Sequence, residues 1–245
     1  MIEIKSASIS FGKKNVLQNV SVKSEIMSNT VILGKNGSGK SVLLKIAAGL
    51  LVPDSGEVLF DGKKISSEDY FRANKLSIGY VFQKGGLFDS MNLFDNVAFP
   101  LRRKGLTENE IPDIVLYNLR RVGLEGSEEK FPTELSGGMQ KRAGIARVLA
   151  MKPKVILYDD PAAGLDPVLT DSIADLILEI RETEKTTSLI VTHDMKFAEK
   201  IADDIVLLDS SQIVFYGDKN KFFSLEDPFA HQFVKGEIEG PIECQ

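Results

Sequence analysis

The sequence has too little cysteine to support disulfides or thiolate metal centres. Its one cysteine, Cys244, stands alone among 245 residues. A single thiol can form neither an internal disulfide nor a cluster of metal-binding thiolates. Small disulfide-stapled domains are therefore excluded, and the composition fits a reducing compartment.

Long apolar runs are also missing from the chain. No stretch reaches the roughly 18 to 20 uninterrupted apolar residues that a membrane-spanning helix needs. The first residues, MIEIKSASISFGKK, resemble a strand and a turn more than a secretory signal. We therefore expect any association with a membrane to depend on a partner protein.

An excess of positive charge is absent as well. The formal net charge is −5, and residues 225–245 hold five acidic side chains and one lysine, which is −4 of that total. The sequence therefore lacks the basic field that binds nucleic acid, and no nucleic acid partner is expected.

Apolar residues are abundant enough for one large domain, or for one domain with an inserted lobe, at 43% of the chain. Residues 2–9, 16–22 and 29–33 predict strands, and residues 41–51 predict a helix that ends before Pro53. An Asp-Gly pair within residues 56–65 predicts a β-hairpin, and residues 76–82 predict another strand.

Residues 92–150 change to helical periodicity and predict an inserted helical lobe. Thr107 and Glu110 have capping-box spacing, but Pro112 favours a later start for that helix. From residue 154 to residue 216, strand-like and helix-like runs alternate, which predicts a mostly parallel sheet covered by helices. The segment after about residue 225 is short, polar and acidic, and disorder is one interpretation of it.

A phosphate-binding loop is the strongest motif in the chain. Residues 34–41, GKNGSGKS, match GxxxxGK[ST] between a predicted strand and a predicted helix. The glycines let backbone N–H groups turn inward and cradle an anion at the helix N-terminus. Lys40 would reach the β- and γ-phosphates of ATP, and the Ser41 hydroxyl would hold Mg²⁺. The candidate nucleotide-binding residues here are Gly34, Lys35, Asn36, Gly37, Ser38, Gly39, Lys40, Ser41 and Val42.

A carboxylate for the metal follows a second buried strand. Residues 155–158 are apolar and Asp159 comes directly after them. Sheets of this kind bind ligands at the carboxyl ends of their strands, so we expect Asp159 to complete the Mg²⁺ site.

Residues 135–140, LSGGMQ, precede a strongly helical run. Here the chain resembles the ATP-binding cassette (ABC) family, whose signature loop is LSGGQ, with Met139 as the one departure. The resemblance covers nearly the whole chain. It implies a P-loop core at about 1–84 and 151–225, an antiparallel β lobe, a helical lobe at about 85–150, and a C-terminal extension at 226–245.

The resemblance also implies roles for single residues. Phe11 would stack on adenine, Gln83 would contact the metal and take part in catalysis, Asp166 would lie in a loop beside the nucleotide, and His193 would be the switch histidine. In the family two subunits enclose two ATP molecules, so a homodimer is implied. In that dimer each ATP would meet the signature residues of the other subunit, Ser136, Gly137 and Gly138.

One position departs from the family in a chemically important way. The family has a glutamate after the metal-linked aspartate, where this chain has Asp160. The aspartate carboxylate lies about 1.5 Å further back, one C–C bond. We expect Asp160 to be the catalytic carboxylate, with slower hydrolysis.

Two segments resemble the Mla/Mce-type phospholipid-transport ATPases: residues 85–102 and residues 227–242. That resemblance implies a permease of the MlaE type, an Mce-domain protein, small regulatory subunits, phospholipid cargo and a place on the cytoplasmic face of a bacterial inner membrane. Apolar residues of the first segment are expected to line a groove for the permease, or to be ordinary core. Residues 226–245 are expected to reach the partner ATPase.

Three other functions remain open at this point. One is an ABC ATPase for another cargo, such as an amino acid or a lipoprotein. Another is a cassette protein acting on DNA or ribosomes, which usually has tandem cassettes or basic patches. The third is a nucleotide-dependent regulator that scarcely hydrolyses ATP, which only Asp160 favours.

Overall fold

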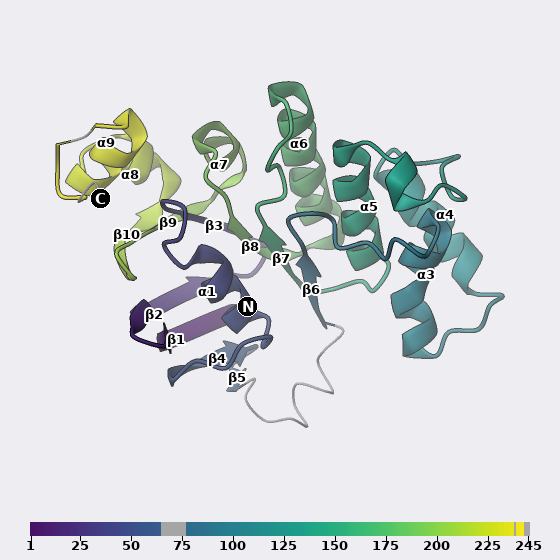
Figure 1. The fold of residues 1–245 in the computed structure, drawn as a ribbon, viewed down its shortest axis with the longest axis horizontal. Helices are drawn as coiled ribbons and strands as arrows, with labels where there is room; N and C mark the ends of the chain where they lie inside the picture. The colour runs from purple at the N-terminus through teal and green to yellow at the C-terminus, as the bar shows by residue number, and fades with distance from the viewer. Residues whose placement is uncertain (65–76, 238, 243–245) are drawn as a thin grey trace.

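The most apolar strands lie side by side in a six-stranded sheet. The computed structural model describes residues 1–64, 77–237 and 239–242. The sheet order is β10-β9-β3-β8-β7-β6, and Figure 1 shows it crossing the middle of the molecule. All neighbouring pairs are parallel except β9 and β10. The strands are β3 (Asn29–Leu33), β6 (Ile78–Val81), β7 (Val155–Asp159), β8 (Thr187–Val191), β9 (Asp204–Asp209) and β10 (Gln212–Asp218).

Both faces of this sheet are covered, which explains its continuous apolar strands. In β7, Val155 and Leu157 join the apolar core on one face, and Ile156 and Tyr158 join the core on the other. The mostly parallel α/β fold expected from the sequence is therefore confirmed.

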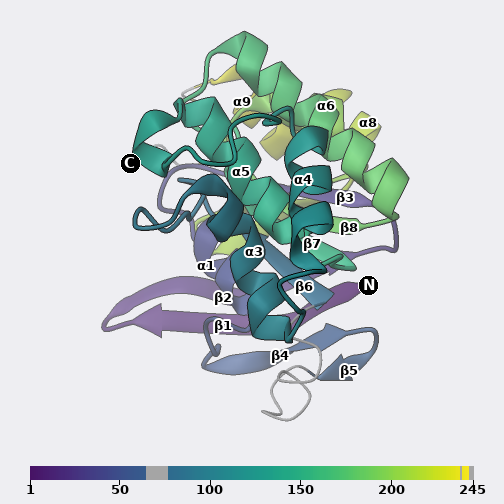
Figure 2. The ribbon, with the colours of Figure 1, turned by 90° about the vertical axis from the view of Figure 1, so that its right-hand side faces the viewer.

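A second, antiparallel sheet covers one face together with α1 (Lys40–Ala47). Its order is β2-β1-β4-β5, and Figure 2 shows it beneath the rest of the molecule. The expected hairpin turns at Asp61 and Gly62, both with positive φ, although Ile65 lies outside the described residues. The strands are β1 (Ile2–Phe11), β2 (Lys14–Ser24), β4 (Ser55–Phe60) and β5 (Lys63–Lys64).

Helix α1 is shorter than the sequence predicts. We expected it to continue to residue 51 and to stop before Pro53, but it ends at Ala47. The N–H groups of Ala48 and Gly49 close the last turn on Leu44 and Ile46. Gly49 then adopts a φ of 66°, a left-handed conformation that ends helices. Glycine, and not the later proline, is therefore the stop signal.

Helices α5 (Gly137–Leu149), α6 (Pro167–Glu184) and α7 (Met195–Ile201) cover the opposite face of the six-stranded sheet. Helices α3 (Leu93–Lys104) and α4 (Ile111–Arg121) pack beyond α5, and a short 3₁₀ turn, η2 (Pro132–Glu134), precedes it. Helix α4 starts at Ile111 with Pro112 in its first turn, so the later start is confirmed.

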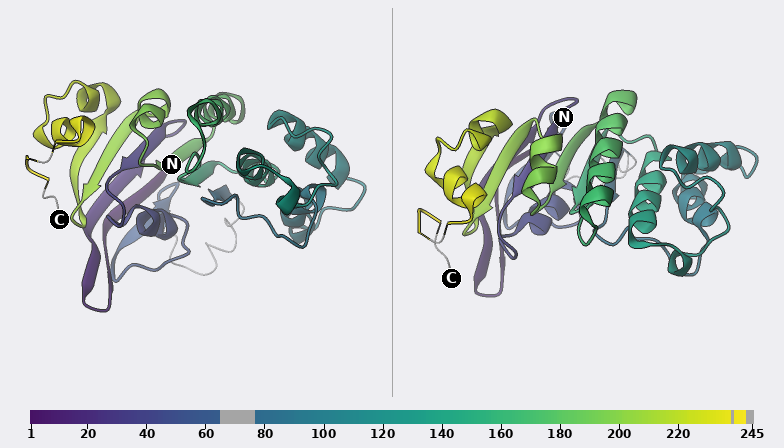
Figure 3. Two further views of the ribbon diagram at one scale, coloured as in Figure 1. Left: turned by 45° about the horizontal axis from the view of Figure 1, so that its top comes forward. Right: turned by 90° about the horizontal axis from the view of Figure 1, so that it is seen from above.

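The C-terminal segment folds back onto the chain at the other end of the molecule from α3 and α4 (Figure 3). It contains α8 (Lys219–Phe223) and α9 (Pro228–Lys235), followed by the buried Ile242. Disorder is therefore the wrong interpretation for residues 226–237 and 239–242. Within the described ranges, no helix has both the length and the apolar content required to cross a membrane.

Candidate functional site

The carboxyl ends of three parallel strands meet beside the start of α1. The loop after β3 leads into α1, β7 ends at Asp159, and β8 lies between these two strands. A cavity of about 310 Å³ opens there. Its lining includes half of the residues singled out from the sequence, namely Asn36, Gly37, Gly39, Lys40, Ser41, Val42, Gln83, Asp159 and Asp160, together with Val16 and Val191.

The loop conformation requires glycine at two positions. Gly34 has a φ of 152°, and a Cβ there would lie 2.2 Å from the Leu208 carbonyl oxygen. Gly39, the N-cap of α1, has a φ of 102°, and its Cβ would lie 2.9 Å from the Val16 carbonyl oxygen. Larger residues would push the loop off β9 and β2, so the glycines bring the backbone of α1's N-terminus to the cavity.

Lys40 supplies the positive charge of the cavity. Its Nζ donates to the carbonyl oxygens of Gly34 at 2.7 Å and Lys35 at 2.8 Å. Burial lowers the pKa of Lys40, while the carboxylates of Asp160 and Asp159 act in the opposite direction. The ammonium group is thus held over the loop where an incoming polyphosphate would lie.

Asp159 is fixed by two hydroxyl groups. The Ser41 hydroxyl donates to Asp159 Oδ1 at 2.8 Å, and the Tyr80 hydroxyl donates to Oδ2 at 2.9 Å. Burial, together with the charge of Asp159, raises the pKa of Tyr80, so that hydroxyl stays protonated. The motif analysis missed Tyr80, because it lies on β6 and becomes a partner of Asp159 only when β6 pairs with β7.

Asp160 and His193 form a pair. His193 Nδ1 lies 2.9 Å from Asp160 Oδ2, and the Thr192 hydroxyl donates to Oδ1 at 3.3 Å. Asp160 is 13% exposed and His193 is 56% exposed, so the ring stands between the carboxylate and solvent. Asp160 has a φ of 49°, an uncommon conformation for a non-glycine residue that turns the chain sharply after β7.

Gln83 joins the site through its loop, and a buried lysine holds that loop. Lys141 Nζ donates to the Gln83 carbonyl oxygen at 3.0 Å and to the Asp160 carbonyl oxygen at 3.4 Å. Burial lowers the pKa of Lys141. Lys141 was also missed, because nothing in its position on α5 indicates that segments 58 and 19 residues away would converge on it.

The remaining expected residues lie outside the cavity lining. Ser136 caps α5 by accepting from the Met139 N–H, and Gly137 and Gly138 form its first turn. Asp166 caps α6. Phe11 is 51% exposed at the end of β1. Their roles toward a nucleotide stay predictions.

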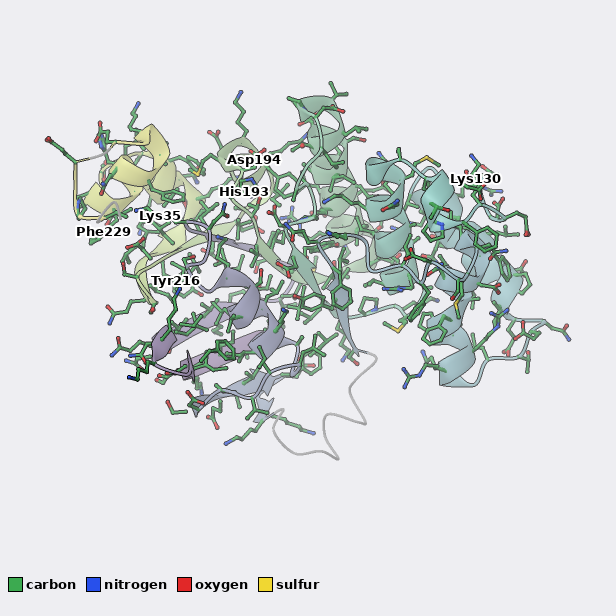
Figure 4. All side chains as sticks on the ribbon, viewed as in Figure 1. Lys35, Lys130, His193, Asp194, Tyr216 and Phe229 are labelled. Carbon is green, nitrogen blue, oxygen red and sulfur yellow. The ribbon has the colours of Figure 1, made fainter. Side chains whose placement is uncertain are left out.

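Two loop residues point elsewhere. The Ser38 hydroxyl is buried and has no hydrogen-bond partner in the described part of the chain. Lys35 lines a smaller cavity with residues of the C-terminal segment, including Phe233 and Ile242, and Figure 4 shows it near Phe229. The Lys35 carbonyl oxygen, by contrast, faces the phosphate-binding loop and accepts a hydrogen bond from Lys40 Nζ.

Comparisons with known proteins agree with this geometry. The family model described as ABC transporter matches residues 17–163. The probable ribonucleotide transport ATP-binding protein mkl of Mycobacterium leprae is 42% identical over 98% of this chain and 70% of its own length. The intermembrane phospholipid transport system ATP-binding protein MlaF of Haemophilus influenzae is 37% identical over 99% of this chain and 93% of its own.

A solved structure shares both the fold and part of the sequence. A dimeric ATP-binding cassette in a post-hydrolysis state, bound to ADP and Pi, superposes with a TM-score of 0.81 at 30% identity, over 89% of this chain and 98% of that one. The resemblance to the cassette family is therefore confirmed, and the chain belongs to the ABC transporter family as an ATP-binding, ATP-hydrolysing subunit.

Proposed function

We propose that this chain binds ATP with Mg²⁺ at the cavity beside α1 and hydrolyses it with Asp160 and His193. One observation carries the proposal. Asp160, oriented by His193, lines the same cavity as Lys40 and the Ser41–Asp159 pair. Groups for binding phosphate, holding a metal and activating water therefore share one site.

The oxygen atoms of the site suit Mg²⁺. A hydroxyl and a carboxylate meet at Ser41 and Asp159, and such oxygen donors are the ligands that this ion prefers. Ser41, Asp159 and Gln83 would hold it. When bound, Mg²⁺ neutralises charge on the β- and γ-phosphates.

The side chains then divide the chemistry. The loop N–H groups and Lys40 would bind and orient the phosphates. Asp160 would accept a hydrogen bond, and then the proton, from the attacking water. His193 would hold the short carboxylate in place, because it bonds Oδ2 at 2.9 Å. A displacement near 1 Å in such a contact costs on the order of 100-fold in rate, so hydrolysis should be slow.

Two substitutions at Asp160 test this assignment. In the assembled transporter we expect Asp160→Asn to reduce steady-state ATPase activity by about 100-fold, because an amide cannot take the proton. Asp160→Glu should keep or raise the rate. An unchanged rate in the Asn variant would show that another group is the catalytic carboxylate.

We further propose that the active form is a homodimer. Ser136, Gly137 and Gly138 do not line the cavity of their own chain, and α5 stands well apart from α1 in Figure 1. A second subunit could supply these residues, and the solved relative bound to ADP and Pi is dimeric. Phe11 and Asp166 would then border the nucleotide.

The cargo that we propose is phospholipid, moved between membranes. This proposal is based on the resemblance of residues 85–102 and 227–242 to Mla/Mce-type ATPases and on the name of the MlaF relative. The chain would sit on the cytoplasmic face of a bacterial inner membrane with a permease of the MlaE type, an Mce-domain protein and small regulatory subunits. The mkl relative, named for ribonucleotide transport, makes ribonucleotide the competing cargo.

Purification of the chain with its permease separates the two cargoes. We expect phospholipid to co-purify, and fluorescent phospholipid to move between vesicles in an ATP-dependent way that Lys40→Ala abolishes. Stimulation of ATPase activity by ribonucleosides, without bound lipid, would favour the competing cargo.

We also propose that residues 226–245 contribute to assembly. Deleting them should weaken the complex and leave ATP binding by the isolated chain within a few-fold of wild type. An unchanged gel-filtration profile of the complex would contradict this role.

A further inference from the structure

Lys141 is a buried cation near the middle of α5, the helix that stands between α6 and α3 in Figure 1. It is 6% exposed. Among the described residues its Nζ meets two carbonyl oxygens, of Gln83 at 3.0 Å and of Asp160 at 3.4 Å, and no carboxylate lies within ion-pair distance of it. Lys141 therefore contacts the backbones of two residues that the proposed hydrolysis requires.

A cation in this place is unfavourable for stability. Burying an ammonium group costs free energy unless its partners replace the lost hydration, and neutral carbonyl oxygens do so only in part. A methionine side chain would fill nearly the same space without that cost. A charge that local stability does not explain is expected at functional sites, so the role of Lys141 follows from the groups that it holds.

The first of these groups belongs to the turn at Asp160. Its φ of 49° is a conformation that persists only where the surrounding structure fixes it. The Asp160 N–H donates to the Val191 carbonyl oxygen at 2.9 Å, and the Asp160 carbonyl oxygen accepts from the Ala163 N–H at 3.1 Å. The Lys141 ammonium contacts the same carbonyl oxygen. Helix α5 thereby helps to fix the backbone from which the short carboxylate projects.

The second group belongs to the loop that follows β6. The Gly85 N–H donates to the Phe82 carbonyl oxygen at 2.9 Å and closes a turn that contains Gln83. A Cβ on Gly85 would lie 2.5 Å from the Gln140 carbonyl oxygen, so the loop backbone lies directly on α5. Lys141, the next residue of α5, then bonds the Gln83 carbonyl oxygen from below this turn.

We propose that Lys141 is a positioning residue for ATP hydrolysis, whose ammonium group fixes the backbones of Gln83 and Asp160 relative to each other so that both side chains point to the attacking water. The inference rests on the proposed role of Asp160. Lys141 does not line the cavity, so it acts through these two residues. Because a displacement near 1 Å in a catalytic contact costs on the order of 100-fold, its loss should slow the chemical step.

Variants at Lys141 in the assembled transporter test this role. Lys141→Met should lower kcat by about 10- to 100-fold. The KM for ATP, and the affinity of the isolated chain for ATP, should change less than about threefold, because the phosphate loop is untouched. Lys141→Arg should keep most of the wild-type kcat, since arginine keeps the charge and has donors for both carbonyl oxygens.

Arg142→Met is the matched control. Arg142 follows Lys141 on α5 and donates to the Val122 carbonyl oxygen at 2.8 Å, outside the lining of the cavity. Its loss should lower the melting temperature and leave kcat per folded chain unchanged. Lys141→Met should show the opposite pattern, with a melting temperature close to that of wild type and a lower kcat.

A double variant separates positioning from a general loosening of the fold. Residues that act as a unit have non-additive effects on rate. In the Asp160→Asn background, Lys141→Met should therefore slow hydrolysis by less than about threefold, although it slows the wild type by much more. A general loosening would multiply the two losses.

Three results would overturn the inference while Asp160→Asn is inactive, and they leave the proposed function intact. They are a wild-type kcat in Lys141→Met, losses that multiply in the double variant, and a Lys141→Arg chain that melts like wild type but is as slow as Lys141→Met. Wild-type activity of Asp160→Asn, by contrast, would overturn the proposed function itself.

Discussion

Two tyrosines on the neighbouring strands β6 and β7 differ in whether their hydroxyl groups are hydrogen-bonded. The Tyr80 hydroxyl orients Asp159, whereas the buried Tyr158 hydroxyl finds no partner in the described part of the chain. We expect Tyr80→Phe to reduce ATPase activity by roughly 10-fold and to raise the Mg²⁺ concentration required, as loss of a metal ligand's support usually does. Steady-state ATPase measured across a Mg²⁺ titration checks this.

Tyr158→Phe serves as the control for that measurement. It removes a buried hydroxyl whose hydrogen-bonding capacity is unused, so the free energy of unfolding should stay equal or rise by about 1 kcal/mol, with ATPase activity unchanged. A loss of activity in this variant would mean that the two strands respond to any change in aromatic packing.

Asp204 gives a pH-dependent prediction at the same scale. Burial raises its pKa above the ordinary 3.8, and Asp203, Asp218 and Glu25 add to the effect. A carboxyl with a raised pKa binds its proton more tightly in the folded state than in the unfolded state. Its contribution to stability therefore falls as the pH rises from 3.8 through the raised pKa of the folded protein. Asp204→Asn should therefore increase the free energy of unfolding at pH 7 by about 0.2–1 kcal/mol.

That gain should vanish below pH 3.8, where Asp204 is protonated in both states, and urea unfolding at several pH values measures it. The adjacent Asp203→Asn is the contrasting variant. Asp203 accepts from Arg181 and from the Asn29 N–H, each at 2.8 Å, so its loss should lower stability, by up to about 1 kcal/mol for an exposed pair.

At the scale of elements, Gln232 on α9 holds the end of the described chain. Its amide donates to the Ile242 carbonyl oxygen at 2.9 Å and accepts from the Ile242 N–H at 2.6 Å. Gln232→Ala should leave these groups unpaired and release residues 239–242, with little change in the melting temperature. Hydrogen exchange of the Ile242 amide should become faster.

The neighbouring His231→Ala provides the comparison, because the His231 side chain is partly exposed and lies 3.2 Å from the Glu237 carboxylate at the surface. Equal exchange rates in the two variants would mean that Gln232 does not hold the segment.

The sequence predicts those parts of the site and fold whose residues are close together in the chain. The loop at residues 34–41 and the strand ending at Asp159 are contiguous, so they are found directly. Helix α9 was not predicted although Asp227 and Pro228 form a capping signal, because the acidic residues on either side of it are typical of a disordered segment. Tyr80 and Lys141 could not be found, since their partners are set by strand pairing and helix packing across distant segments.

At the scale of the whole molecule, the proposed dimer predicts complementation between damaged chains. Lys40→Ala removes the phosphate contact of one subunit, and Ser136→Arg blocks its signature loop. Each homodimer should be inactive. In a mixed dimer both lesions fall in one composite site and the other site is intact, so co-expression should restore part of the ATPase activity. Mixtures without activity would mean that each chain completes its own site, or that both sites must act together.

Helix α5 connects three parts of the molecule through residues spaced along its length. Ser136 caps one end, Lys141 holds the Gln83 and Asp160 backbones near the middle, and Arg147 lines an apolar surface cavity of about 420 Å³ near the other end. Thirteen helical residues span roughly 20 Å. A Cβ on Gly144 would lie 2.5 Å from the Gly85 carbonyl oxygen, so the helix packs directly against the backbone at Gly85. A displacement of α5 at either end would therefore also shift the Gln83 and Asp160 backbones, which Lys141 holds.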